Sequence, residues 1–296
     1  MSKIIAVTNQ KGGVGKTTTA INLGASLALA DQRILLIDTD PQANLTSGVG
    51  LRGKTPAAGT VYDVLTGEDD EVENIDAFLV PSPVEGLTIL PSDRNLTGAE
   101  LELVSLPQRE SRLRRSLQRL RDRFDYIFID CPPSLGLLTL NALVAADAVL
   151  IPLHCEYFAL EGLADLVSTL QRVRASFNHH LEIEGVLLTM YDERTNLGQQ
   201  VAREVREFFK EKVFETVIPR NVRLGEAPSH GLPVPLYDVR SRGAEAYAAL
   251  AKEFLARNQG QETIELGARN SGLGPHQPAF DQRIESPEPR AGSRKE

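Results

Sequence analysis

The chain has 296 residues, of which 42% are hydrophobic and 5% aromatic, and its formal net charge is −8. This length and apolar content suit one large α/β domain or two small ones. Two cysteines are too few for a disulfide framework, and no apolar run approaches the roughly 20 residues of a membrane span, so we expect a reduced, cytoplasmic protein. The acidic balance alone argues weakly against nucleic acid as a partner, but it leaves room for a local basic patch.

Short apolar runs alternate along the chain with segments of helical periodicity. The expected strands cover residues 3–8, 33–38, 86–91, 126–131, 148–153 and 184–190. The expected helices cover residues 18–30, 97–124, 160–177, 197–212 and 242–257. The strands are apolar on both faces, which is typical of parallel strands covered by helices. The alternation predicts the α/β class, with a doubly wound, mostly parallel sheet flanked by helices, and ligands at the carboxyl ends of its strands.

The pattern changes near residue 259, where the sequence becomes rich in Gly, Pro, Ser and charge. This composition predicts a disordered C-terminal tail over 259–296, after one domain over 1–258. The tail lacks the apolar stripe of a membrane-surface helix, so we expect no membrane partner.

A glycine-rich loop, "KGGVGKTT", follows the first expected strand and opens the first expected helix. It is a compact variant of the phosphate-binding loop, whose glycines let backbone N–H groups surround phosphates at a helix N-terminus. Lys16 would reach the β- and γ-phosphates, Thr17 would bind Mg²⁺, and Thr18 would donate to the α-phosphate. The predicted nucleotide-binding residues of this loop are Gly12, Gly13, Val14, Gly15, Lys16, Thr17 and Thr18.

Three carboxylates stand at the ends of two expected strands. Asp130 is the predicted Mg²⁺ anchor, acting through water, because an acidic strand end beside a phosphate loop often has that role. Asp40 is the candidate for positioning the attacking water. Asp38 either supports the metal shell or only holds its loop.

Several separated segments together resemble the ParA/Soj chromosome-partitioning ATPases, a P-loop group with a deviant Walker A motif that also includes the relative MinD. The segments are "KGGVGKTT", "DTDPQAN", "FIDCPPSLGLLTLNAL", "CEYFALEGL", "EGVLLTMYDERTNLG" and "IPRNVRLGEAPSHGLPV". The resemblance runs from about residue 3 to 254. It implies a Mg²⁺-dependent ATPase that forms a homodimer in the ATP state, in which Lys11 of each chain reaches the phosphates bound by the other. Gly12 would allow the close backbone approach, and Lys11, Lys16 and Asp40 would be the catalytic residues.

The resemblance also implies the other contacts of the site. Pro219 and Asn221 would contact the adenine. The ATP-bound dimer would bind DNA without sequence preference, on the nucleoid, and a ParB-like activator would stimulate hydrolysis and release. The predicted DNA-binding residues are Arg194, Arg223, Arg220, Arg240 and Arg242. The alternative is a MinD-like or cargo-positioning ATPase that acts on a membrane or a protein cluster.

Overall fold

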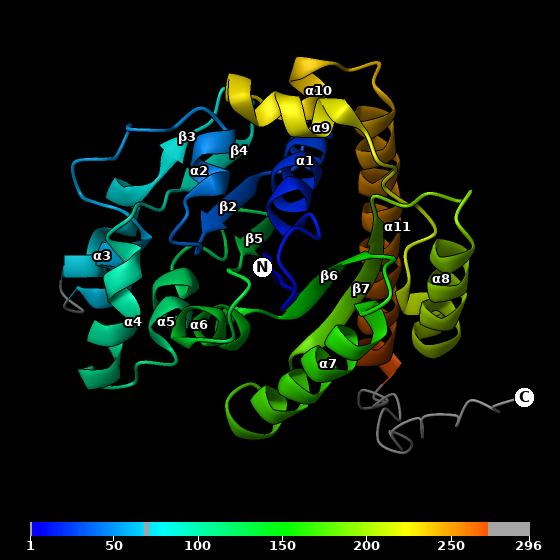
Figure 1. Ribbon diagram of the computed structural model, residues 1–296. Coiled ribbons are helices and arrows are strands. Elements are labelled where there is room, and N and C mark those ends of the chain that lie inside the picture. Colours follow the sequence, from blue (N-terminus) through cyan, green and yellow to red (C-terminus); the bar gives the residue numbers. More distant parts are fainter. Residues whose placement is uncertain (1, 68–70, 272–296) are drawn as a thin grey trace, which may run out of the picture. The chain divides into compact units, whose positions relative to one another are not determined.

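The computed structural model describes residues 2–67 and 71–271, with side chains described over 2–67 and 74–259 (Figure 1). Residues Met1–Phe254 form one compact unit, and a second unit begins at Leu255. Within the described residues, none of the helices combines the length and apolar character needed to cross a membrane.

Within the described part of the chain, seven strands form one sheet in the order β3-β4-β2-β5-β1-β6-β7. Their bounds are β1 Lys3–Val7, β2 Ile34–Asp38, β3 Val80–Pro81, β4 Leu87–Leu90, β5 Tyr126–Asp130, β6 Ala148–His154 and β7 Glu182–Thr189. Neighbouring strands pair in parallel except β3 and β4, which are antiparallel. The predicted doubly wound α/β class is therefore confirmed. The sequence did not indicate β3, because a two-residue edge strand has no detectable periodicity.

Helices cover both faces of the sheet (Figure 1). The longer ones are α1 Lys16–Ala28, α4 Leu96–Ser105, α5 Arg112–Gln118, α6 Leu137–Ala145, α7 Ala159–Ser176, α8 Asn196–Phe209 and α11 Arg242–Ser271. The shorter ones are α2 Asn44–Gly48, α3 Val61–Thr66, η1 Glu71–Phe78, η2 Lys210–Lys212, α9 Val222–Glu226, η3 Ala227–His230 and α10 Val234–Tyr237. Helix α6 and the short helices other than η2 were not predicted, while η2 lies within the helix predicted over 197–212.

The two faces of the sheet are buried by different helices. Ile4 and Ala6 of β1 belong to a core cluster with residues of α3–α7. On the other face, α1 packs against β2 and β5, and Phe254 of α11 lies 5.8 Å from Phe128 of β5 between ring centroids. Burial on both faces explains why these strands read as continuous apolar runs rather than alternating ones.

The single helix predicted over 97–124 is wrong, because the structure has α4 and α5 with a break between them. The break lies at Pro107. Leu106 before it is extended, with ψ of 145°, as expected for a residue that precedes proline. Gln108 after it adopts a positive φ of 50°.

The helix at the C-terminal end also extends beyond its predicted bounds. Helix α11 continues to Ser271, so residues 259–271 are helical in the structure although we predicted a tail from 259. The remainder of that predicted tail, 272–296, lies outside the described residues.

The strand order brings the predicted functional segments to one edge of the sheet. In β5, Asp130 pairs in register with Val7 of β1 on one side and with Asp38 of β2 on the other. The glycine-rich loop follows β1 directly and leads into α1. All of these segments therefore meet at the carboxyl ends of the central strands, where ligands of such sheets bind.

Candidate nucleotide-binding site

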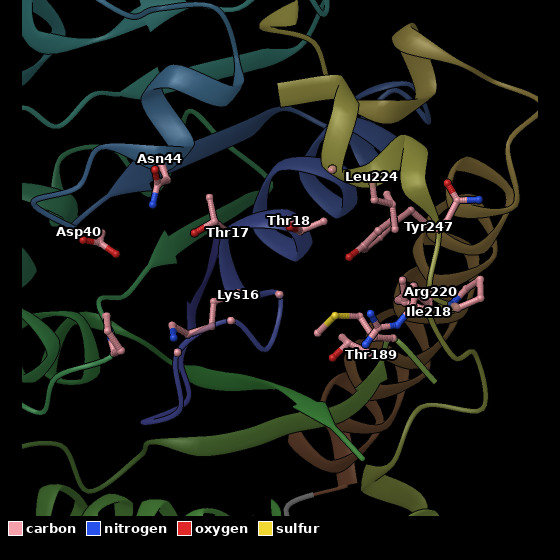
Figure 2. A pocket seen from close by; sticks show the side chains of 18 of the residues that line it. Lys16, Thr17, Thr18, Asp40, Asn44, Thr189, Ile218, Arg220, Leu224 and Tyr247 are labelled. Atoms are coloured by element: carbon pink, nitrogen blue, oxygen red, sulfur yellow. The ribbon is translucent and has the colours of Figure 1, made fainter. Parts of the chain in front are cut away.

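A cavity of about 540 Å³ opens along this edge of the sheet (Figure 2). Its volume is in the range of small-molecule sites. The lining residues are Gly12, Gly13, Gly15, Lys16, Thr17, Thr18, Asp40, Gln42, Asn44, Pro133, Thr189, Met190, Ile218, Pro219, Arg220, Asn221, Leu224, Gly225 and Tyr247. Figure 2 shows Lys16, Asp40 and Asn44 toward one end, and Leu224, Arg220 and Tyr247 toward the other.

Two glycines of the glycine-rich loop adopt a backbone conformation that favours glycine. Gly13 and Gly15 adopt positive φ angles of 72° and 88°, which residues with a side chain rarely adopt. Val14 does not line the cavity, because its side chain is buried. Its carbonyl oxygen accepts a hydrogen bond of 2.8 Å from the Thr189 hydroxyl of β7. The loop is therefore hydrogen-bonded to β7 through Val14, while its glycines face the cavity.

Lys16 is buried at the start of α1. Its Nζ donates a 3.1 Å hydrogen bond to the carbonyl oxygen of Lys11 across the loop. Burial lowers the Lys16 pKa, and the nearby carboxylates of Asp130 and Asp40 oppose that shift. A buried ammonium with one backbone acceptor has unused donors, which a phosphate group can take.

Asp130 is fully buried at the end of β5, and neither of its carboxylate oxygens has a hydrogen-bond partner among the described residues. Burial raises its pKa well above the usual range, and the charge of Asp38 adds to that shift. The Thr17 hydroxyl lies close enough to oppose it. Two buried, unpartnered oxygens beside Thr17 are the donor set that a hydrated Mg²⁺ would complete.

Asp38 is also buried, but its oxygens are already used. They accept hydrogen bonds from the backbone N–H of Thr46 at 2.8 Å, the Thr46 hydroxyl at 2.7 Å and the Asp40 backbone N–H at 3.2 Å. Burial nevertheless raises the Asp38 pKa to about 6. Of our two predicted roles for Asp38, these contacts favour holding the loop that carries Asp40.

Asp40 lines the cavity, and its Oδ1 accepts a 2.9 Å hydrogen bond from the backbone N–H of Gln42. One oxygen is thereby fixed to the loop, while the carboxylate as a whole faces the cavity opposite Thr17 (Figure 2). A carboxylate held in this way can orient a water molecule at the phosphate end.

The described residues contain no group of three or more His, Cys, Asp or Glu side chains arranged to hold a metal ion. A Mg²⁺ ion here would therefore take most of its ligands from nucleotide phosphates and water, as Mg²⁺ usually does. The Thr17 hydroxyl and the Asp130 carboxylate fit that requirement.

Lys11, like Val14, does not line the cavity, although the glycines, Lys16, Thr17 and Thr18 of the loop do. Its ammonium forms an ion pair with Glu156, which follows β6. Gly12 does line the cavity, yet its φ is not positive, and a Cβ added there would meet nothing within 4 Å in this chain. Among the described residues of one chain, none therefore requires glycine at position 12.

Pro219 and Asn221 line the end of the cavity away from the phosphate loop. Asn221 caps α9, and its side-chain oxygen accepts a 2.9 Å hydrogen bond from the backbone N–H of Arg223. Its amide N–H groups remain as donors, which suits the ring nitrogens of a purine. The same end includes Tyr247 of α11, whose hydroxyl lies 3.2 Å from that of Thr19. The sequence contained no motif that pointed to Tyr247.

The five predicted DNA-binding arginines differ in their surroundings. Arg220 lines the cavity. Arg194 is held by Asp192 through two hydrogen bonds, of 2.8 and 2.7 Å, and its side chain is 85% exposed. Arg223 pairs with Glu226 at 2.7 Å and with Asp238 at 3.2 Å. Arg240 and Arg242 are exposed after α10 and at the start of α11.

A phosphate loop between the first strand and first helix, next to strand-end carboxylates, defines the class of P-loop nucleoside triphosphatases. Residues 2–183 match a protein family described as an AAA domain. The chain is 57% identical over 256 residues to the sporulation initiation inhibitor protein Soj of Bacillus subtilis, covering 86% of this chain and 99% of that protein. It is 53% identical over 258 residues to the chromosome partitioning protein ParA of Myxococcus xanthus, covering 87% of this chain and 89% of that one.

A solved structure gives the same fold. Cobyrinic acid a,c-diamide synthase from Mycobacterium smegmatis, with bound ADP and magnesium, superposes with a TM-score of 0.74 at 38% identity, covering 88% of this chain and 96% of that one. The present chain belongs to the Soj/ParA family of chromosome-partitioning ATPases.

Proposed function

We propose that this chain is an ATP-dependent DNA-partitioning protein. ATP and Mg²⁺ bind in the 540 Å³ cavity and bring two chains together, and the dimer binds DNA without sequence preference. A ParB-like activator then stimulates hydrolysis, which separates the chains and releases the DNA. The observation that carries this proposal is the 57% identity to Soj over 99% of that protein, together with a cavity whose phosphate end is built from Lys16, Thr17 and Asp40.

The reaction is phosphoryl transfer to water, and the residues of this chain have separate roles in it. Lys16 replaces its bond to the Lys11 carbonyl with bonds to phosphate oxygens. Thr17 and, through water, Asp130 would hold Mg²⁺, which would supply positive charge for the phosphates. Asp40 orients the attacking water and accepts its proton. The N-terminus of α1 adds positive potential at the same place.

Lys11 of the neighbouring chain supplies the remaining cation in this proposal. In the monomer its ammonium lies outside the cavity. The charge that develops in phosphoryl transfer is therefore stabilised fully only after a second chain has bound. Slow hydrolysis by the isolated chain follows from this arrangement.

DNA binding rests on Arg194, Arg223, Arg240 and Arg242, with Arg220 at the rim of the cavity. The chain as a whole is acidic, with a net charge of −8, so binding depends on local clusters and not on the overall charge. Two weak patches that are linked in a dimer bind far more tightly than one. Nucleotide-dependent dimerisation would thereby control DNA binding.

The deciding experiment measures binding of the full chain to a long DNA duplex with ATP, with ADP and without nucleotide. We expect salt-sensitive binding with ATP only, accompanied by a shift from monomer to dimer in light scattering. Equal binding in all three states would contradict the proposal. Sedimentation with anionic liposomes under the same conditions tests the MinD-like alternative, which predicts ATP-dependent recovery with the vesicles instead.

A further inference from the structure

Glu156 lies between two basic side chains at the rim of the phosphate loop. One oxygen accepts from the Lys11 ammonium, and the other lies 2.6 Å from Nδ1 of His154. The hydrogen bond from Lys11 is the main reason why the pKa of Glu156 is lowered, and the positive charge of Arg220 acts in the same direction. Glu156 therefore remains ionised and paired in the monomer.

The backbone of Lys11 is fixed independently of its side chain. Its N–H donates a 3.0 Å hydrogen bond to Oδ1 of Asn9, and the Asn9 amide donates a 2.8 Å bond to the carbonyl oxygen of Pro152. Asn9 is buried, so this anchor is well protected. The side chain beyond it can therefore turn toward another partner without any change in the loop.

We infer that Glu156 is a positioning residue that holds the Lys11 ammonium in the monomer and releases it when a second copy of this chain presents its bound triphosphate. Delivery of Lys11 is then an exchange in which a carboxylate partner is replaced by phosphate oxygens of the neighbouring chain. The inference rests on the proposed function, because it requires that Lys11 act across a dimer.

The exchange makes the two states of Lys11 mutually exclusive. A lysine held by Glu156 cannot stabilise charge on a nucleotide, so an ATP-bound monomer lacks that cation. The pair is partly exposed, with 37% of the Lys11 side chain and 45% of the Glu156 side chain accessible. Exposed ion pairs are weak, so the release is readily reversible. Glu156 would thus raise the protein concentration at which dimers form, without affecting the affinity of a single chain for nucleotide.

The first test replaces Glu156 with Gln, which keeps the shape and removes the charge. Two pairs are broken per dimer, and each exposed pair contributes a factor of about 1.4 to 5, so we expect dimerisation with a non-hydrolysable ATP analogue at about 2- to 25-fold lower protein concentration. Nucleotide affinity measured at concentrations where the chain is monomeric should stay within about twofold. Unchanged or weaker dimerisation of Glu156→Gln would overturn the inference.

Glu161→Gln is the matched control. Glu161 is an exposed acid in the first turn of α7, five positions further along the chain, and forms no ion pair with another described residue. The Glu161→Gln substitution removes the same charge from a nearby position but leaves Lys11 paired with Glu156. We expect its dimerisation to match that of the wild type. An equal gain in both variants would attribute the effect to overall charge and overturn the role of Glu156.

The second test detects the exchange directly. A carbodiimide joins a carboxylate to an amine only where the two are in contact, so the nucleotide-free wild-type chain should give a Lys11–Glu156 crosslink within one chain, identified by peptide mass spectrometry. Saturation with the ATP analogue should lower its yield at least about fivefold. An undiminished yield in the dimer contradicts release. A Lys11–Glu156 crosslink between two chains would also contradict release, and a mixture of isotopically light and heavy protein would reveal it.

These readouts separate the two proposals. A wild-type chain that stays monomeric with the analogue refutes the proposed function, and with it any release of Lys11. A chain that dimerises normally while Glu156→Gln shows no gain refutes only the role of Glu156.

Discussion

The phosphate end of the cavity and the arginine surface are both rich in charge, but their charged side chains differ in burial and in pairing. At the phosphate end, Lys16 and Asp130 are buried, and both oxygens of Asp130 lack a partner among the described residues. On the surface, Arg194 is 85% exposed and already paired with Asp192. Buried, incompletely paired charges have high free energy until a ligand completes them. Exposed pairs contribute little and exchange partners readily. Substitutions at the phosphate end should therefore have larger effects than substitutions on the arginine surface.

The largest effect is expected for the rate of hydrolysis after Asp40→Ala. The variant loses the carboxylate that orients water, so we expect turnover to fall by about 10²- to 10⁴-fold while ATP still binds and dimers accumulate. Single-turnover hydrolysis and light scattering measure the two quantities. Asp93→Ala, in the loop after the neighbouring strand β4, is the control and should hydrolyse ATP normally. Full turnover in Asp40→Ala would remove Asp40 from this role.

The next effect concerns ATP affinity after Lys16→Ala. Removing the buried ammonium leaves phosphate oxygens unpaired, at a cost of roughly 2–5 kcal/mol in binding free energy. Isothermal titration with ATP and Mg²⁺ measures it. Lys11→Ala is the informative comparison, because the Lys11 ammonium faces Glu156 and not the cavity. We expect monomeric Lys11→Ala to bind ATP within a few-fold of wild type. Equal losses in both variants would break the distinction between the two lysines.

A smaller effect of opposite sign is expected for the stability of the nucleotide-free chain after Asp130→Asn. Because burial raises the Asp130 pKa, the folded state retains a proton that the unfolded state releases. The free energy of unfolding of the wild type should therefore fall as pH rises from the ordinary carboxyl pKa toward the raised value. Removing the unpaired charge should stabilise the chain by about 1–3 kcal/mol at pH 8. Stabilisation by Mg²⁺ and ATP should be weakened.

Urea unfolding at pH 5 and pH 8 checks this prediction. Asp125→Asn is the opposite case at the start of the same strand, because the Arg33 side chain lowers the pKa of Asp125. That variant should be slightly less stable than wild type at pH 8. If Asp130→Asn were also less stable than wild type at pH 8, the unpaired Asp130 carboxylate would not destabilise the nucleotide-free chain, and its proposed role toward Mg²⁺ would lose its support.

The position of the glycine-rich loop, between the first strand and the first helix, could be predicted from the sequence because the constraints there are local. Gly13 and Gly15 adopt positive φ angles, and Asp38 and Asp130 are the last residues of two apolar strands that pair in register. Six strands and the class of fold follow from the same apolar runs. The break at Pro107 was also encoded locally, but helical periodicity on both sides of it concealed the boundary.

Contacts between distant segments could not be predicted from the sequence in the same way. Tyr247 reaches the cavity only because α11 packs beside α1, and no local pattern records that. The pairing of Lys11 with Glu156 depends on the neighbouring positions of β1 and β6. The ion-pair partners of exposed arginines could not be predicted either, because the fold of the segment between Arg223 and Asp238 brings these two residues together.

The smallest effects are expected on the arginine surface, and they test its side of the comparison. Arg194→Glu and Arg223→Glu should each lower DNA affinity about several-fold to tenfold at low salt and reduce the salt dependence by about one ion, with ATP-dependent dimerisation unchanged. Filter binding at several salt concentrations measures both. Arg172→Glu on α7, which lies on the opposite side of the sheet from α9 in Figure 1, is the matched charge reversal and should have a weaker effect.

Asp192→Asn sharpens the same test because it frees Arg194 from the acid that holds it. If the pair opens when DNA binds, this variant should bind DNA somewhat more tightly than wild type, and the gain should disappear in combination with Arg194→Ala. A gain that persists without Arg194 would reflect only the lower negative charge of the chain. In that case Arg194 is an ordinary exposed arginine held by its neighbour, and the DNA contacts must be sought around Arg223 and the start of α11.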